Sequence, residues 1–292
     1  MKHIVARIYL PKQELSPTNK ASLKIQNNNI LFLRQTLLEA CHFSISDDKN
    51  SWELVFFKDT SYKQHIFVKF LDISHIETKN INETIKKSSP DYKQYNHLYS
   101  ACCLIDEKEL NQVSERLSIS VRESKSIKEN HFLEHTSHHD HIDGKGFSFF
   151  THLPKQVGNF ERSILLLSLA YAYLEAMAVL NDELSKTIAR EPTNVSLLQD
   201  IYIKATKFNG IFFYNQPVLH DKTTLAEVWE RINNTLGITK ANQELLNKLS
   251  NAHYILNLDK EQKQQKKQFI INIIFALAGI LIGAAQLSPF FK

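Results

Sequence analysis

The chain has 292 residues, 43% of them hydrophobic, which is enough for one large or two modest packed domains. A formal net charge of +4 excludes the class of strongly basic proteins that bind nucleic acid through their overall positive charge. Three cysteines, two of them adjacent, exclude a disulfide scaffold and are typical of a reducing compartment.

The first part of the chain, 1–155, carries the patterns of a mixed α+β domain. The runs 51–59 and 65–73 are strand-like and close enough to form a hairpin. Helical spacing of apolar residues predicts a helix over 30–43, and 107–117 is expected to be a surface helix. Other predicted strands are 3–10, 95–106, 118–124 and 146–153. Residues 79–89 are expected to form a short helix or loop, and 123–145 a long polar loop or an interrupted helix.

A helical layer is expected over 156–240. Residues 161–192 are apolar almost all round, and 164–180 is long enough to be considered for a membrane span. Glu175 would be costly at a bilayer centre, so a buried helix is favoured there. The amphipathic segment 223–238 predicts a helix with Thr223 or Thr224 as its N-cap.

The end of the chain predicts a stalk helix and a transmembrane helix. No Pro or Gly separates 241–268 from Phe269–Leu287, a stretch of 19 residues without formal charge. At about 1.5 Å per residue that stretch spans roughly 28 Å, close to the hydrocarbon core of a bilayer. One continuous helix of up to about 45 residues is therefore expected.

Four lysines stand just before this stretch, at 260, 263, 266 and 267, and one follows it, at 292. The positive-inside rule places the preceding chain in the cytoplasm of a single-pass inner-membrane protein. The predicted fold is an α+β cytoplasmic domain (1–155), a helical layer (156–240), a stalk helix (241–268) and one C-terminal transmembrane helix (269–288).

The transmembrane stretch contains small and amide side chains. Small residues one turn apart allow close helix packing in lipid, so self-association is expected. If several copies assemble, the amides would form rings that line a pore; the alternative is that they lie at the two interfaces. The residues concerned are Asn272, Ala276, Gly279, Gly283 and Gln286.

Histidines and carboxylates crowd residues 131–147, a composition that can hold a transition metal. The run HHDHIDGKGF resembles the HHExxDGxGYP signature of the HD-GYP cyclic-dinucleotide phosphodiesterases, without its tyrosine and proline. That resemblance implies a di-metal hydrolase; adventitious metal binding and a solvated polar loop are the alternatives. The metal-ligand candidates are His135, His138, His139, His141 and Asp143.

Basic residues in the middle of the chain form a candidate site for an anionic ligand, with a solvated charged face as the alternative. They are Arg122, Lys125, Lys128 and Arg162. No nucleophile elbow, Walker A loop or GxGxxG fingerprint occurs, so no catalytic residue and no cofactor is predicted.

The layout of 155–292, a helical layer with a long stalk helix that enters a C-terminal span, resembles the CorA-like membrane proteins. The Gly-Met-Asn signature and the second span of that family are absent. Single-span relatives occur as channel-forming effectors of bacterial anti-phage systems such as the Hailong type. The resemblance implies a homo-oligomer that gates a pore in the bilayer when a nucleotide or oligonucleotide, made by a partner enzyme, binds its cytoplasmic domain. Two other functions stay open: a tail-anchored metal-dependent phosphohydrolase and a membrane-anchored scaffold.

Overall fold

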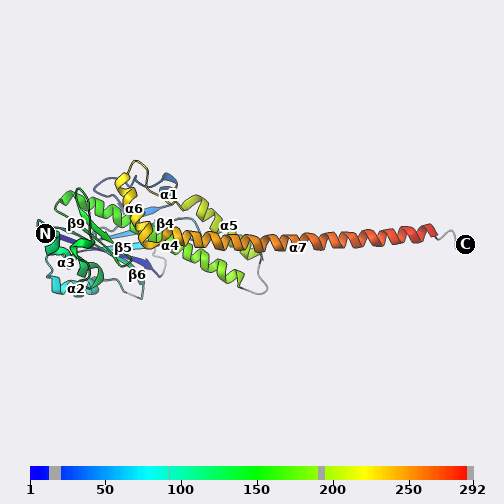
Figure 1. Ribbon diagram of the computed structural model, residues 1–292, viewed down its shortest axis with the longest axis horizontal. Coiled ribbons are helices and arrows are strands. Elements are labelled where there is room, and N and C mark those ends of the chain that lie inside the picture. Colours follow the sequence, from blue (N-terminus) through cyan, green and yellow to red (C-terminus); the bar gives the residue numbers. More distant parts are fainter. Residues whose placement is uncertain (13–20, 92, 190–194, 288–292) are drawn as a thin grey trace. The chain divides into compact units, whose positions relative to one another are not determined.

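The computed structural model describes residues 1–12, 21–91, 93–189 and 195–287 (Figure 1). The chain divides into two compact units. The first is formed by 1–179 and 207–243, and the second by 180–206 and the chain from 244 onward.

A mixed sheet forms the centre of the first unit, with nine described strands in the order β2-β3-β4-β5-β1-β6-β9-β8-β7. Neighbouring strands are antiparallel except β6 and β9, which are parallel. The expected hairpin of β4 and β5 is confirmed. The strands are β1 (Lys2–Pro11), β2 (Ala21–Ser22), β3 (His42–Ile45), β4 (Ser51–Phe56), β5 (Gln64–Asp72), β6 (Tyr95–Ile105), β7 (Leu133–Glu134), β8 (His139–Ile142) and β9 (Gly146–Thr151).

One face of the sheet is covered by α2 (Ile81–Ser88) and α3 (Leu110–Arg122). The prediction of a strand over 118–124 is wrong, because most of that segment is the second half of α3. Every third or fourth residue of α3 packs against the sheet, and Glu123 ends the helix in the left-handed conformation at φ +59°. The inward-facing residues of α3 are Leu110, Val113, Leu117 and Val121.

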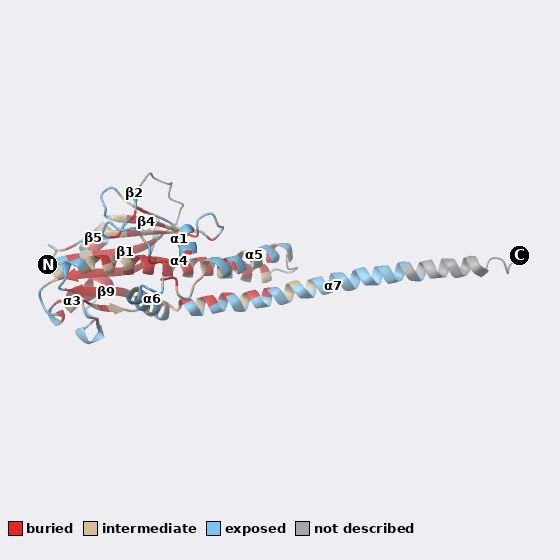
Figure 2. Cartoon of the chain, turned by 90° about the horizontal axis from the view of Figure 1, so that it is seen from above, coloured by how far each residue is buried: buried red, intermediate tan, exposed pale blue. Residues whose placement is uncertain are grey.

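The opposite face is covered by α4 (Val157–Ile188). Phe160 stacks on Phe147 of β9, and Tyr171 packs against Tyr99 of β6. The segment Pro154–Ile188 is long and apolar enough to cross a membrane, and 72% of its most apolar window is buried inside the protein. This burial confirms the expected buried helix in 164–180 (Figure 2).

The helix predicted over 30–43 is much shorter: α1 covers Gln35–Glu39, and β3 begins at His42. The preceding residues pair instead with a distant segment. The Leu219 amide donates to the Phe32 carbonyl (2.9 Å), and the Arg34 amide donates to the Pro217 carbonyl (2.9 Å). This pairing holds the segment before α6 against the start of α1.

The remaining helices are α5 (Val195–Lys207), a π-helix (Phe208–Phe212), α6 (Thr223–Leu236) and α7 (Ile238–Leu287), with 3-10 turns at Thr78–Asn80, Glu129–His131 and Pro154–Gln156. Only Gly237 separates α6 from α7, and its φ of +69° suits glycine. The α7 helix has 50 residues, so the prediction of one continuous helix is confirmed. Lys222 is the N-cap of α6 and makes no side-chain cap, so the prediction of Thr223 or Thr224 is wrong.

In the second unit, α5 packs beside α7 through stacked rings of Tyr202 and His253, 5.8 Å apart. Beyond 260 the described side chains of α7 are exposed (Figure 2). Large apolar side chains are among them: Phe269, Ile270, Ile271, Ile273 and Ile274.

Candidate anion-binding pocket

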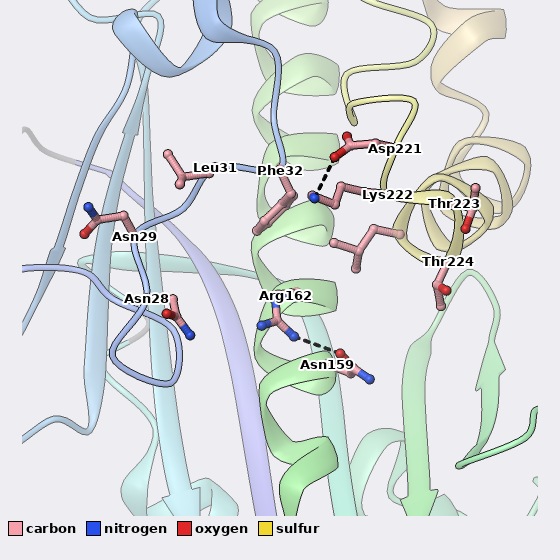
Figure 3. A pocket seen from close by; sticks show the side chains of 11 residues that line it. Asn28, Asn29, Leu31, Phe32, Asn159, Arg162, Asp221, Lys222, Thr223 and Thr224 are labelled. Atoms are coloured by element: carbon pink, nitrogen blue, oxygen red, sulfur yellow. Dashed lines mark hydrogen bonds and ion pairs between the residues drawn. The ribbon is translucent and has the colours of Figure 1, made fainter.

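A cavity of about 560 Å³ lies in the first unit beside the start of α4 (Figure 3). Three segments far apart in the sequence line it: 28–32, the first turn and a half of α4, and 221–225. We call it the Arg162 pocket. Its lining residues are Asn28, Asn29, Leu31, Phe32, Asn159, Arg162, Asp221, Lys222, Thr223, Thr224 and Leu225.

A tight turn forms one wall of the pocket. Ile25 and Asn28 exchange two backbone hydrogen bonds of 3.0 Å around Gln26 and Asn27, whose φ angles are +50° and +64°. Asparagine tolerates this left-handed conformation, whereas for Gln26 a positive φ is strained. The side-chain Nε2 atom of Gln26 donates a hydrogen bond to the Lys155 carbonyl (2.8 Å), which holds the turn against the start of α4.

Gly158, which has no side chain, leaves the space that this turn occupies. A Cβ at Gly158 would stand 2.2 Å from the carboxamide carbon of Gln26. Glycine at the start of α4 therefore allows the turn to lie directly against the helix. The close approach brings Asn28 and Asn29 to the rim of the pocket.

The start of α6 forms the opposite wall. Within the described chain, no acceptor is found for the backbone N–H groups of Thr223, Thr224 and Leu225, because the first helical bond is from Ala226 to Lys222. Such unsatisfied N–H groups, together with the helix dipole, attract anions. The two threonine hydroxyls stand at the same wall (Figure 3).

Arg162 supplies a positive charge on the α4 side of the pocket. Its guanidinium donates to the Asn159 side-chain oxygen (2.8 Å), and among the described residues it forms no ion pair with a carboxylate. The second cation, Lys222, is exposed and pairs with Asp221 at 2.7 Å. The charged side chains of the lining are Arg162 and Lys222 on the positive side and Asp221 on the negative side. The pocket is thus net positive.

The chemistry of this lining favours binding over catalysis. Its acidic side chain, Asp221, has a lowered pKa, chiefly because the Lys222 ammonium donates a hydrogen bond to the carboxylate. Its other polar groups are amides, hydroxyls and permanent cations, which bind anions without transferring protons. Phe32 supplies an apolar wall.

The predicted basic residues do not gather in one site. Arg162 lines the pocket, whereas the other three lie at the end of α3 and in the loop after it, on the opposite side of the sheet. Arg122 is mostly buried and forms an ion pair with Asp143. Lys125 pairs with Glu115 at 2.8 Å, and Lys128 precedes the 3-10 turn Glu129–His131.

The predicted metal ligands separate into two groups because β8 alternates its side chains. His135, His138 and Asp140 bring one ligand atom each within 4.8 Å of one another. The rings of His135 and His138 stack at 4.5 Å, and His138 in turn stacks on Phe149. Asp140 was not among the predicted ligands, although it lies between two of them in the sequence.

Asp140 already has a cationic partner. Burial alone would raise the pKa of Asp140, but hydrogen bonds from His138 and Arg231 outweigh it and hold the pKa below its usual value. Arg231 also stands 3.3 Å from the Nε2 atom of His135. A metal ion would therefore have to displace the guanidinium of Arg231.

His139 and His141 point to the other face of the sheet. His141 lies 3.3 Å from Asp143 and 3.2 Å from Arg122, and its own pKa is lowered by burial. His139 packs near Phe150. Neither belongs to the group around Asp140.

In α7, Asn272 and Ala276 are exposed. The surroundings of Gly279, Gly283 and Gln286 lie outside the described side chains, and 288–292 lie outside the described residues. The predicted roles of the amides in pore lining, and of the small residues in helix packing, stay predictions.

Comparison with known proteins gives no relatives: no family model, no curated protein and no solved structure matches the chain.

Proposed function

We propose that this chain is a membrane effector. Its Arg162 pocket binds a nucleotide or oligonucleotide, and its C-terminal helices assemble from several copies into a gated pore. One observation carries the ligand assignment: Arg162, which has no carboxylate partner among the described residues, shares a cavity with the start of α6, where no side chain caps the helix. The cavity of about 560 Å³ is within the range of small-molecule sites, and Phe32 offers an apolar surface for a base.

The membrane part of the proposal rests on α7. Its residues from 269 to 274 are apolar apart from Asn272, and all are exposed. Exposed apolar area costs about 25 cal/mol per Å² in water, so a run of this kind favours a lipid environment. The uncharged sequence continues to Leu287, and four lysines precede it.

The chain offers a direct connection between ligand and pore. The start of α6 lines the pocket, and one residue, Gly237, joins the end of α6 to α7. A ligand that favours one position of α6 would bias α7, which continues unbroken to Leu287. Because one helix cannot conduct, the proposal requires oligomers.

Ligand binding is tested by the thermal stabilisation of the full chain in detergent, with ADP, ATP and a short oligoadenylate as probes. We expect at least one probe to stabilise the protein. The variant Arg162→Gln should weaken binding roughly tenfold or more, because a charge-assisted hydrogen bond contributes about 1.5–3 kcal/mol. The control Lys125→Gln removes an equal charge outside the pocket and should bind normally. Equal affinities of Arg162→Gln and the wild type would reject the pocket as the site.

The pore is tested by light scattering in detergent and by ion flux from liposomes. Exclusively monomeric protein would rule out the pore. Flux that is unaffected by Gly279→Leu together with Gly283→Leu would remove these glycines from helix packing, since leucine prevents close approach.

A metal-dependent hydrolase is the second candidate, because His135, His138 and Asp140 can converge on one ion. A cavity of about 270 Å³ opens beside Asp140 and Arg231. Metal analysis of the purified full chain separates the two candidates. A stoichiometric metal lost in His135→Ala would favour the hydrolase, whereas the effector proposal expects none.

A further inference from the structure

We propose that the central sheet binds single-stranded nucleic acid on the area that α3 leaves uncovered, with phosphates on two cations and bases on aromatic rings. We call this area the open face. It lies on the side of the sheet opposite α4, so it is separate from the Arg162 pocket and from the proposed function. The residues of the open face are Arg7 and Tyr9 of β1, Phe67 and Lys69 of β5, and Tyr95 and His97 of β6.

Helix α3 covers only part of its side of the sheet. The residues that pack with it there include Val5 of β1, and Cys102 and Leu104 of β6. Because side chains alternate along a strand, Arg7 and Tyr9 point to the same side as Val5 but lie further along β1. Apart from Tyr9, the members of the open face are partly or fully exposed, so a ligand can reach them.

The two cations of the open face stand side by side. Arg7 and Lys69 are direct cross-strand partners on β1 and β5, where like charges repel each other. Within the described chain, neither side chain forms an ion pair or a hydrogen bond, and the Nε atom of Arg7 is buried without an acceptor. An anion held between the two side chains would remove this repulsion. Arginine and lysine are the side chains that most often contact phosphates in nucleic-acid complexes.

Four aromatic rings gather beside the cations on the same face. The ring centroid of Tyr9 lies 6.3 Å from that of Phe67 and 6.1 Å from that of Tyr95. It lies 5.5 Å from that of His97. Tyr9 is 3% exposed, so it supports the other three rings, and its hydroxyl has no hydrogen-bond partner in the described chain. Stacking on an aromatic ring stabilises any base, so this cluster favours nucleic acid over a simple anion.

The spacing of cations and rings suits a nucleotide. Residues two apart on a strand are separated by about 7 Å, so the two cations lie one row from Tyr9 and Phe67. The sugar of a nucleotide holds its base several ångströms from its phosphate, so a phosphate over the cations places its base over the rings. Burial and the charge of Arg7 lower the pKa of His97 to about 4, so this ring stacks in its neutral form at pH 7. Glu53, the cross-strand partner of Phe67 on β4, repels phosphates from the far end of the row.

Fluorescence anisotropy of the full chain in detergent tests the open face. The probe is a labelled thymidylate single strand of about 12 nucleotides, a length within the usual range for stacking platforms. We expect the single strand to bind roughly tenfold or more tightly than a duplex of the same length. The bases of a duplex are stacked on each other, so the rings of the open face cannot reach them.

Two variants separate the contributions of charge and stacking. Arg7→Gln/Lys69→Gln should weaken binding and lower the slope of log affinity against log salt by about 1.4, at about 0.7 for each lost phosphate contact. Phe67→Leu keeps an apolar side chain but removes the ring, so it should weaken binding roughly fivefold or more and leave the salt slope unchanged. The matched control Lys108→Gln/Lys240→Gln removes the same charge from exposed positions outside the open face and should bind normally.

Three outcomes would overturn the proposal. Equal affinities for the single strand and the duplex would show a surface that binds phosphates alone. Loss of strand binding in Arg162→Gln, with Arg7→Gln/Lys69→Gln unaffected, would place the strand in the Arg162 pocket. A wild type that does not bind the strand would reject the open face outright. The salt slope of the cation variant decides the question even where Phe67→Leu unfolds the protein. Rejection of the Arg162 pocket by the nucleotide probes would leave the open face standing, because the two sites share no residue.

Discussion

Arg231 of α6 and Asp140 of β8 form a bidentate ion pair, with nitrogen–oxygen distances of 2.9 and 2.6 Å. The Asp140 side chain is 1% exposed and that of Arg231 is 25% exposed. The pair ties the helix that begins at the Arg162 pocket to the sheet. It also occupies the carboxylate that a metal ion would need.

We expect Asp140→Asn to lower the free energy of unfolding by about 3 kcal/mol, because removing one partner leaves a partly buried charge without compensation. Chemical denaturation of the full chain in detergent measures the loss. The control Glu115→Gln breaks an exposed pair with Lys125 and should change stability by less than about 1 kcal/mol. Equal effects of the two variants would show that burial of Asp140 adds nothing.

Removing the competing cation should create a metal site. In Arg231→Met, the carboxylate of Asp140 becomes available beside His135 and His138, so we expect zinc affinity to rise at least tenfold over the wild type. Isothermal titration with Zn²⁺ measures it. Adding His138→Ala to this variant should abolish the gain. Tight binding of zinc by the wild type would instead show that the metal ion displaces the Arg231 guanidinium from Asp140.

Local patterns predicted much of this fold. The hairpin of β4 and β5 follows from two strand-like runs with a short connection. The buried α4 follows from a segment that is apolar almost all round, and the unbroken α7 from the absence of Pro and Gly between its two halves. The strand prediction for 118–124 failed because two patterns overlap there. Ile119 and Val121 alternate as in a strand, but Val121 also continues the helical 3-and-4 spacing that starts at Leu110.

The candidate site was less predictable, because its walls are joined by contacts between distant residues. The amide of Leu219 bonds to Phe32 across most of the chain, and no local pattern connects the two. Arg162 was predicted as a ligand residue for its charge alone. The run Asn27–Asn29 and the two threonines at the start of α6 were visible signals, but nothing in the sequence indicated that they meet.

His3 should make the first unit sensitive to acid. Burial and the charge of Arg116 lower its pKa to about 3, while Asp72 opposes this shift. The Nε atom of Arg116 donates to its ring (2.7 Å), and Ser120 faces its other nitrogen. In the unfolded chain His3 gains a proton below about pH 6.5, but in the folded chain it stays neutral, so stability falls as pH drops from about 6.5 towards 3.

At pH 5 this histidine should account for about 2 kcal/mol of lost stability, from 1.36 kcal/mol per pH unit below its unfolded pKa. Denaturation midpoints of the full chain across this range measure the slope. His3→Asn keeps an acceptor for Arg116 and removes the titration, so its profile should be flatter. His97, whose pKa is lowered to about 4 by burial and Arg7, remains in both proteins and sets the residual slope. Parallel profiles would contradict the assignment to His3.

Gly158→Ala should disturb the pocket through the turn that packs on it. The added Cβ would meet the carboxamide end of Gln26, which is flexible and can move away. The move breaks the hydrogen bond from Gln26 to the Lys155 carbonyl, at a cost of about 1 kcal/mol. It also releases a strained turn that holds Asn28 at the rim, so binding of the nucleotide probe should weaken several-fold.

Gln26→Gly separates this effect from simple crowding. Glycine removes the obstructing side chain and tolerates the φ of +50°, so adding Gly158→Ala to it should cost little further affinity. The losses of probe affinity should be strongly non-additive. Each single variant loses the hydrogen bond that holds the turn, so the double variant should lose no more affinity than either single variant. Additive losses would mean that Gly158 acts on the pocket by another route. Unchanged probe binding in all three variants would show that the turn does not shape the site.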